Sequence, residues 1–344
     1  MRAKRPVRAV LFLFLSVGGC EDFDPDQDGP FSWETKLMDL VDVSRGREVP
    51  VKIYYPADGP TEFVRTGACP LVILSHGAGG SRNGFPDCGA RLGSWGFVGV
   101  VVEHVGSNTE TIEALMEQGM TLVEAIHTVA TDTNEWRNRP LDVTFILDQA
   151  EAWNVSDPDL RGKIDLSSIG IYGNSYGGFT SLAISGALVN LPEGLTALGD
   201  ARVGAAFPVS PPPPNGLGGI FASESFLPVE IPMFLASGSE DQGLEIDPED
   251  RLIPFRIMQG QGNPTELWHL WIEGAHHMDF AYTEGQPPRA DEVQRIVLAE
   301  MTAFFDRFLR ARESSERYLT EEYADSLTGA NIPDTTLYQG AVTQ

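Results

Sequence analysis

The sequence predicts a single α/β domain built on a mostly parallel, eight-stranded sheet that helices cover on both faces. Short and almost continuous apolar runs alternate with longer stretches of helical periodicity, which is typical of parallel sheets buried on both sides. Two strands near the N-terminus have alternating apolar residues instead, which is typical of antiparallel edge strands. About 310 residues follow residue 33, and this length suits one large core.

The predicted strands follow one another along the chain, with a helix between most of them. The two edge strands cover residues 35–43 and 48–55. The six apolar runs cover residues 71–74, 97–102, 169–172, 203–207, 233–236 and 267–272. Because crossovers between parallel strands are right-handed, this alternation predicts a doubly wound sheet.

The predicted helices cover residues 84–95, 110–130, 134–153, 176–188, 249–259 and 291–312. The last of these has its apolar residues at helical spacing, which indicates a packing face. Residues 210–228 contain a run of four prolines and several glycines, so they cannot continue a helix or a strand. They follow the sixth strand, where loops line the ligand crevice. They either cover a substrate or form a plain surface excursion.

Residues 1–19 are typical of a bacterial lipoprotein signal peptide. A basic start with four Lys and Arg residues precedes an apolar run at residues 9–17, which is too short to span a bilayer. Small residues directly precede Cys20, as in a lipobox, so we expect Cys20 to be lipidated. The alternative is an ordinary signal peptide with an incidental cysteine. Lipidation implies a protein anchored in the cell envelope, on the periplasmic or cell-surface side.

The remaining organisation follows from composition. Residues 20–33 are acidic, which predicts a tether that does not pack on the domain. We expect residues 34–312 to form the α/β domain and residues 313–344 to form a C-terminal extension. The formal net charge is −25, and loss of the four positive charges of the signal peptide makes it −29. Such an excess of negative charge argues against nucleic acid and anionic membrane surfaces as partners.

Cys69 and Cys88 either form a disulfide or remain free thiols.

A G-x-S-x-G motif joins a predicted strand to a predicted helix. It consists of Gly173, Asn174, Ser175, Tyr176 and Gly177. In this context the motif is a nucleophile elbow, because its glycines permit a sharp turn close to the serine. The serine hydroxyl then lies at the positive end of the helix. The motif therefore predicts Ser175 as a nucleophile.

A serine nucleophile needs a base, and the base needs an acid that orients it. In this arrangement the order along the chain is serine, acid, histidine. The loop after the seventh strand supplies Asp241, with Glu240 as its rival, and the loop after the eighth supplies His277, with His276 as its rival. The loop after the sixth strand holds no carboxylate. We therefore predict Asp241 as the acid and His277 as the base.

Two backbone N–H groups are expected to bind the oxyanion that forms during acyl transfer. One belongs to Tyr176, directly after the nucleophile, and the other to Ala78 in the Gly-rich loop at residues 76–80. His76 is expected to brace this loop rather than to react. His104 ends the fourth strand near the crevice, where it could contact substrate; the alternative is a structural role.

Four segments, at residues 74–82, 139–143, 173–178 and 274–280, resemble the dienelactone-hydrolase-like and platelet-activating-factor-acetylhydrolase-like branch of the α/β-hydrolases. The resemblance covers about residues 47–310 and implies the α/β-hydrolase fold. Its G-x-x-D and G-A-x-H-x-x-F motifs map the acid onto Asp241 and the base onto His277. Ser175 departs from dienelactone hydrolases, which use cysteine there. The acetylhydrolases tend to place their acid after the sixth strand, where this chain has none, which weakens that substrate assignment.

These features predict a serine hydrolase that cleaves carboxylic esters of short acyl chains through an acyl-enzyme. Its partner would be a small-molecule or lipid ester, and the mechanism requires neither a metal nor an organic cofactor. A peptidase or thioesterase on the same fold is one alternative, because a triad does not declare its leaving group. A non-catalytic surface-binding lipoprotein is another. A metal-dependent hydrolase would use His276, His277, Asp279 and His104, but no ligand spacing supports it.

Overall fold

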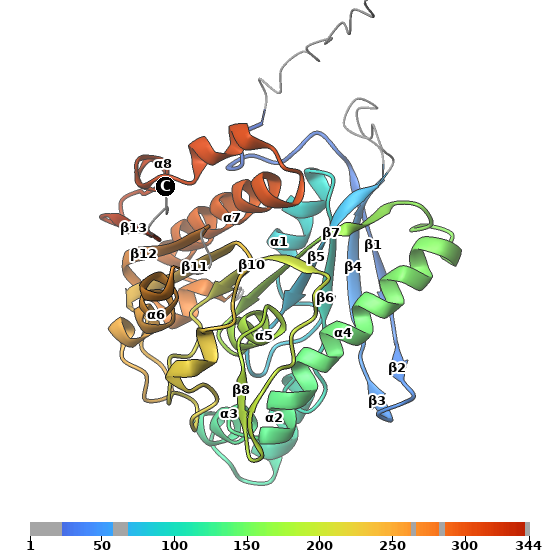
Figure 1. Ribbon diagram of the computed structural model, residues 1–344, viewed down its shortest axis with the longest axis vertical. Helices are drawn as coiled ribbons and strands as arrows, with labels where there is room; N and C mark the ends of the chain where they lie inside the picture. Colours follow the sequence, from blue (N-terminus) through green and yellow to red (C-terminus); the bar gives the residue numbers. More distant parts are fainter. Residues whose placement is uncertain (1–22, 58–67, 263–265, 282–285, 341–344) are drawn as a thin grey trace, which may run out of the picture.

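The computed structural model describes residues 23–57, 68–262, 266–281 and 286–340, which fold around one central sheet (Figure 1). In these residues the sheet has nine strands, in the order β1-β4-β6-β5-β7-β10-β11-β12-β13. All eight predicted strands are present. The ninth, β13 (Thr335–Gln339), comes from the predicted C-terminal extension and pairs antiparallel with β12. The mostly parallel α/β class is confirmed, but the predicted count of eight strands is one too few.

The strands β6, β5, β7, β10, β11 and β12 form the parallel body of the sheet, and β4 and β1 extend it antiparallel. The apolar side chains of the six parallel strands are almost fully buried, as continuous apolar runs require. The bounds are β1 (Trp33–Met38), β4 (Val51–Pro56), β5 (Cys69–Ser75), β6 (Val98–Val102), β7 (Ile164–Asn174), β10 (Val203–Val209), β11 (Met233–Glu240) and β12 (Leu267–His276). Two small ladders are β2 (Val41–Asp42) with β3 (Arg47–Glu48), and β8 (Val189–Leu191) with β9 (Gly194–Thr196).

Helices cover both faces of the sheet (Figure 1). One core lies under α4, α5 and α6, and the other lies under α1 and α7. The bounds are α1 (Pro86–Ser94), α2 (Thr109–Glu117), α3 (Leu122–Ala130), α4 (Thr133–Ser156), α5 (Tyr176–Ile184), α6 (Ile253–Gln261), α7 (Pro288–Leu309) and α8 (Glu321–Ser326). Short 3-10 helices are η1 (Ser223–Phe226), η2 (Pro248–Leu252), η3 (His277–Phe280) and η4 (Glu313–Tyr318).

The helix predicted at residues 110–130 is in fact two helices, α2 and α3. Gly119 has a φ of 101° and ends the first of them. Thr121 then caps α3, and its side chain and that of Glu124 form a reciprocal capping box. The apolar periodicity continues through this break, and it therefore concealed the turn. As a result α3 lies beside the end of the sheet that carries Ser175.

The segment predicted as an unpacked tether packs on the domain from Phe23 onward. Phe23 is buried, and its ring lies 4.8 Å from that of Trp95 in an edge-to-face arrangement. Asp26 forms an ion pair of 2.7 Å with Arg295 of α7. An aromatic anchor and a charge pair thus outweigh the acidic composition of the segment. The predicted signal peptide and Cys20 lie outside the described residues.

Cys69 in β5 and Cys88 in α1 are both free thiols, so the pairing that the sequence left open does not form. Burial raises the pKa of Cys88 to about 12, with a further contribution from the nearby Asp87 carboxylate. In the described part of the chain, no helix combines the length and the apolar character needed to cross a membrane.

Candidate active site

Ser175 occupies the sharp turn between β7 and α5 that its motif predicts. Its backbone has a φ of 57°, a conformation that residues other than glycine rarely adopt and that is typical of functional turns. A Cβ added to Gly177 would lie 1.8 Å from the carbonyl oxygen of Ser75, and one added to Gly173 would lie 2.2 Å from that of Gly177. Glycine at both positions is therefore required for the close packing of this turn.

Side chains from two other loops reach Ser175. Nε2 of His277 lies 3.0 Å from Oγ of Ser175, and Nδ1 of His277 lies 2.6 Å from Oδ1 of Asp241. Asp241 follows β11 and is fully buried. Because a carboxylate only accepts hydrogen bonds, we assign the imidazole proton to Nδ1, which leaves Nε2 to accept from the serine hydroxyl. The structure thus brings the three predicted side chains into one hydrogen-bonded row.

The rival residues lie outside this row. Glu240 and His276 are exposed and stand opposite one another in the β11–β12 pair. The His276 backbone N–H donates to Asp279 Oδ2 at 2.8 Å. Consecutive residues of an extended chain point to opposite sides, so only one member of each adjacent pair faces Ser175. In both pairs the second residue, Asp241 or His277, is the one that faces the site.

A buried arginine that the sequence analysis did not single out holds the Asp241 carboxylate. Nε of Arg251, in η2, lies 2.9 Å from Asp241 Oδ1 and donates to the Asp241 carbonyl oxygen at 2.8 Å. The Ser210 hydroxyl donates to Asp241 Oδ2 at 2.6 Å, and Arg251 Nη1 donates to the Ser210 carbonyl oxygen at 2.8 Å. Both carboxylate oxygens therefore have partners besides His277. No motif surrounds Arg251, so its role had no signal in the sequence.

The two predicted oxyanion donors lie beside Ser175. Tyr176 is the first residue of α5, where the helix leaves its N–H groups without internal acceptors. The oxyanion loop, residues 76–80, passes next to the nucleophile, since a Cβ on Gly77 would lie 3.5 Å from that of Ser175. In the described part of the chain, the N–H groups of Ala78 and Tyr176 donate to no backbone acceptor. Both remain available to a negatively charged oxygen.

His76 fixes the peptide group that carries the Ala78 donor. Its Nδ1 lies 2.6 Å from the Gly77 carbonyl oxygen, and its Nε2 accepts from the His104 backbone N–H at 3.0 Å. These two contacts require the neutral tautomer with its proton on Nδ1. Burial, with the nearby Arg139 charge, lowers the pKa of His76 well below its ordinary value of 6.5. His76 therefore braces the loop, as the sequence predicted.

Arg139 of α4 is fully buried under the same loop. It donates to the His76 carbonyl oxygen and to the hydroxyls of Thr180, at 3.0 Å, and Ser107, at 2.8 Å. Its guanidinium carbon lies 4.3 Å from the centre of the Tyr176 ring, a cation–π contact. Burial lowers the pKa of Arg139 to about 10. One cation therefore contacts Tyr176, which carries one expected oxyanion donor, and the start of the loop that carries the other.

A cavity of about 460 Å³ opens onto Ser175, His277 and the oxyanion loop. Part of its apolar lining comes from α3 and from the Pro-rich loop after β10, and this part consists of Val123, Ile126, Ala130, Pro212 and Leu217. The loop at residues 210–228, which the sequence left open between a cover and a surface excursion, thus contributes directly to the cavity.

His104 lies behind the oxyanion loop and does not line this cavity. It is fully buried, donates from Nδ1 to Asp142 Oδ2 at 3.0 Å, and accepts the Ser75 hydroxyl at Nε2 at 2.9 Å. The interpretation that His104 contacts substrate is therefore wrong, because its position at a strand end placed it below the loop. No group of three or more His, Cys, Asp or Glu side chains in the described residues could hold a metal ion.

Comparison with known proteins relates the N-terminal part of the domain to a family. Residues 42–140 match the family model described as platelet-activating factor acetylhydrolase, isoform II. The matched span contains the oxyanion loop and Arg139 and ends before Ser175. A search of curated proteins found no match. The mostly parallel sheet with helices on both faces is of the α/β-hydrolase type, and the family match is consistent with the platelet-activating-factor-acetylhydrolase-like branch.

Proposed function

We propose that the protein is a serine esterase that hydrolyses carboxylic esters of short acyl chains. The observation that carries this proposal is the hydrogen-bonded row of Ser175, His277 and Asp241, with distances of 3.0 Å and 2.6 Å. The family match supports an ester hydrolase in general. The order of the three residues along the chain agrees with that of serine α/β-hydrolases.

In the proposed mechanism, Nε2 of His277 takes the Ser175 proton while Oγ attacks the ester carbonyl carbon. The backbone N–H groups of Ala78 and Tyr176 donate to the resulting oxyanion, and the ionised Asp241 stabilises the imidazolium. His277 then protonates the departing alcohol, which leaves the acyl group on Ser175. Water attacks this acyl-enzyme with His277 again as the base, and the carboxylic acid departs. No step requires a metal or an organic cofactor.

The cavity supports a small, largely apolar substrate. Its volume of about 460 Å³ lies in the lower half of the range for ligand pockets, roughly 300 to 1,000 Å³. Aliphatic side chains of α3 line part of it, so an alkyl group bound against them would be desolvated. The formal net charge of −25 disfavours strongly anionic substrates by long-range repulsion.

Turnover of p-nitrophenyl acetate, butyrate and octanoate by the wild type and Ser175→Ala tests the proposal. We expect wild-type turnover to decrease with acyl length, and Ser175→Ala to lose at least about 10³-fold of kcat/KM. Ser185→Ala, at the other end of α5, is the matched control and should retain activity. Undiminished turnover by Ser175→Ala would rule out the serine mechanism.

We further propose that Cys20 is lipidated and holds the enzyme on a membrane of the cell envelope. The small residues before Cys20 and the preceding apolar run support this. Metabolic labelling with an alkyne fatty acid should mark the wild type and not Cys20→Ser. The variant should also leave the membrane fraction. Equal labelling of both proteins would refute lipidation at this residue.

A further inference from the structure

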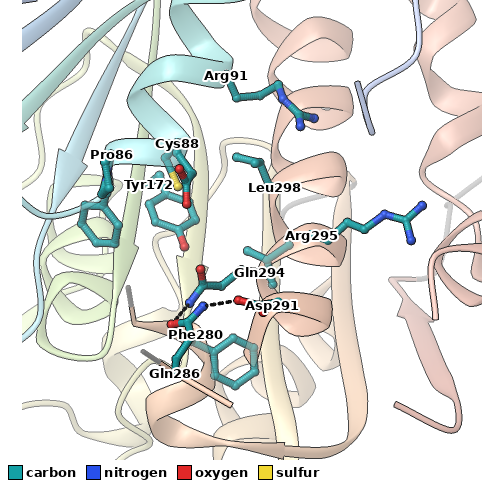
Figure 2. A pocket seen from close by; sticks show the side chains of 13 residues that line it. Pro86, Cys88, Arg91, Tyr172, Phe280, Gln286, Asp291, Gln294, Arg295 and Leu298 are labelled. Atoms are coloured by element: carbon teal, nitrogen blue, oxygen red, sulfur yellow. Dashed lines mark hydrogen bonds between the residues drawn. The ribbon is translucent and has the colours of Figure 1, made fainter. Parts of the chain in front are cut away.

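A second cavity, of about 260 Å³, lies between α1 and α7. Figure 2 shows Cys88 and Tyr172 on one side of it, Leu298 and Gln294 of α7 on the other, and Phe280 at one end. The mechanism proposed above uses none of these side chains. The cavity therefore needs an explanation of its own.

Four of the polar side chains around this cavity, those of Gln286, Gln294, Arg91 and Arg295, have partners other than a ligand. Gln286 donates to Asp291 at 2.9 Å, and Gln294 donates to Gln286 at 2.9 Å (Figure 2). Arg91 and Arg295 point away from the cavity, toward ion pairs with aspartates of the N-terminal segment. The rest of the lining contains the exposed Asp87 carboxylate and the Cys88 thiol, but rings and aliphatic groups make up most of it, which suits an alkyl chain better than a charged group.

Phe85 lines both cavities. Its side chain is 8% exposed, and its ring lies 5.3 Å from that of Tyr172 at an angle of 88°. The Phe85 backbone has a φ of 55°, a left-handed conformation that bulky residues rarely adopt, directly before Pro86 at the start of α1. The chain thus holds an aromatic ring at this boundary in spite of an unfavourable backbone conformation.

We propose that Phe85 limits the length of the alkyl chain that the catalytic cavity accepts, and that the second cavity is a chain-binding extension closed by this ring. The inference rests on the proposed esterase function and specifies its substrate class. In this arrangement a chain bound on the Ser175 side ends at the Phe85 ring, and the second cavity lies beyond it. Removal of the ring would join about 460 Å³ to a further 260 Å³ of apolar space.

The first experiment compares the chain-length preference of the wild type with those of Phe85→Ala and the milder Phe85→Leu. Acyl length is varied in p-nitrophenyl esters, and alcohol length is varied in acetate esters. In at least one series, we expect the ratio of octyl to short-chain kcat/KM to rise by about tenfold or more in Phe85→Ala, since each accommodated methylene improves binding. Phe85→Leu should give a smaller rise.

Two further variants show that the gain depends on the second cavity. Leu298→Phe fills that cavity from α7, so the double variant with Phe85→Ala should lose the gain. Val155→Ala removes an exposed aliphatic side chain of α4 that lines neither cavity, and this control should change the ratio by less than about threefold. An unchanged ratio in both Phe85 variants, or a gain that Leu298→Phe does not reduce, would overturn the proposal.

The Cys88 thiol gives a readout independent of turnover, because it lines the second cavity. The protein is first inactivated with methyl or octyl p-nitrophenyl phosphonate and then treated with iodoacetamide, and Cys88 alkylation is followed by peptide mass mapping. In Phe85→Ala the octyl adduct should slow alkylation relative to the methyl adduct, whereas in the wild type the two rates should agree. Equal rates in Phe85→Ala would refute the extension. If hydrolysis depends on Ser175 but the Phe85 variants keep the wild-type chain-length preference, this inference alone is refuted. If the wild type has no esterase activity, the proposed function is refuted as well.

Discussion

The two flanks of Ser175 are built alike, since each rests on a buried arginine, but the two arginines face different partners. On the acid–base flank, Arg251 lies 2.9 Å from the Asp241 carboxylate. On the oxyanion flank, Arg139 contacts a carbonyl oxygen, hydroxyls and the Tyr176 ring, and no described carboxylate lies within 4.0 Å of it. One buried cation is thus neutralised directly, and the other is not.

This difference matches the charges that the proposed mechanism requires. Negative charge develops on the substrate oxygen between Ala78 and Tyr176, and an uncompensated cation beneath that position stabilises it in a water-poor site. On the other flank the charge of Asp241 is already shared between Arg251 and His277, so its main effect is to hold the imidazole in place. The comparison therefore assigns electrostatic stabilisation to Arg139 and positioning to Arg251.

The largest effect should come from the base that joins the two flanks. We expect His277→Ala to lower kcat on the order of 10⁴-fold, because Ser175 then has no proton acceptor. His276→Ala should stay within about threefold of the wild type, because this side chain is exposed and outside the row. Steady-state kinetics on a p-nitrophenyl ester measure both. A larger loss in His276→Ala would exchange the two assignments.

Removal of the uncompensated cation should have the next largest effect. Arg139→Met keeps the volume and loses the charge, so we expect kcat to fall by about 100-fold with little change in KM, as on loss of an oxyanion donor. Arg139→Lys should recover part of the activity. Near-UV circular dichroism checks that each variant is folded. A loss seen only in KM would indicate that Arg139 shapes the cavity instead.

Arg251, which is paired with the Asp241 carboxylate, should affect kcat less than Arg139 does. In Arg251→Met the Ser210 hydroxyl still donates to Asp241, and His277 still has its acceptor. We therefore expect kcat to fall by only about tenfold, through looser imidazole geometry. The same kinetic assay compares the two methionine variants directly. A greater loss in Arg251→Met than in Arg139→Met would reverse the contrast between the flanks.

The smallest effect concerns stability at low pH. Burial lowers the pKa values of His76 and His104 well below 6.5. Below about pH 6.5 the unfolded chain binds protons at these two histidines and the native state does not. Each histidine therefore lowers the free energy of unfolding by about 1.4 kcal/mol for every unit by which the pH decreases. Urea unfolding from pH 7 to pH 5 should show a shallower decrease in His104→Asn than in the wild type. His276→Asn serves as the exposed-site control, and equal slopes in all three proteins would contradict the assignment.

Features set by local sequence were predictable, whereas those set by distant contacts were not. The glycines of the elbow fix a turn within five residues, so Ser175 and its strand–helix setting followed from the motif. The order of strands then identified the loops of Asp241 and His277. The choice between adjacent residues depends on which side chain faces Ser175, and only the resemblance to a family addressed it.

The two arginines show the limit most clearly. Arg139 lies 63 residues from His76 in sequence, and Arg251 lies 41 residues from Ser210, yet each donates to the other member of its pair. Arg139 begins one of the segments that carry the family resemblance, but neither its local pattern nor that of Arg251 indicates burial or a partner in the site. For the same reason β13 was missed, because a five-residue edge strand depends on its pairing with β12 rather than on its own pattern.

Covalent labelling of the nucleophile tests the central claim most directly. The wild type, Ser175→Ala and His277→Ala are treated with a fluorophosphonate, and the modified residue is found by peptide mass mapping. We predict one adduct, on Ser175, that forms rapidly in the wild type, is absent from Ser175→Ala, and forms far more slowly in His277→Ala. An adduct on another residue, or an unlabelled Ser175 in folded wild type, would contradict the proposed triad.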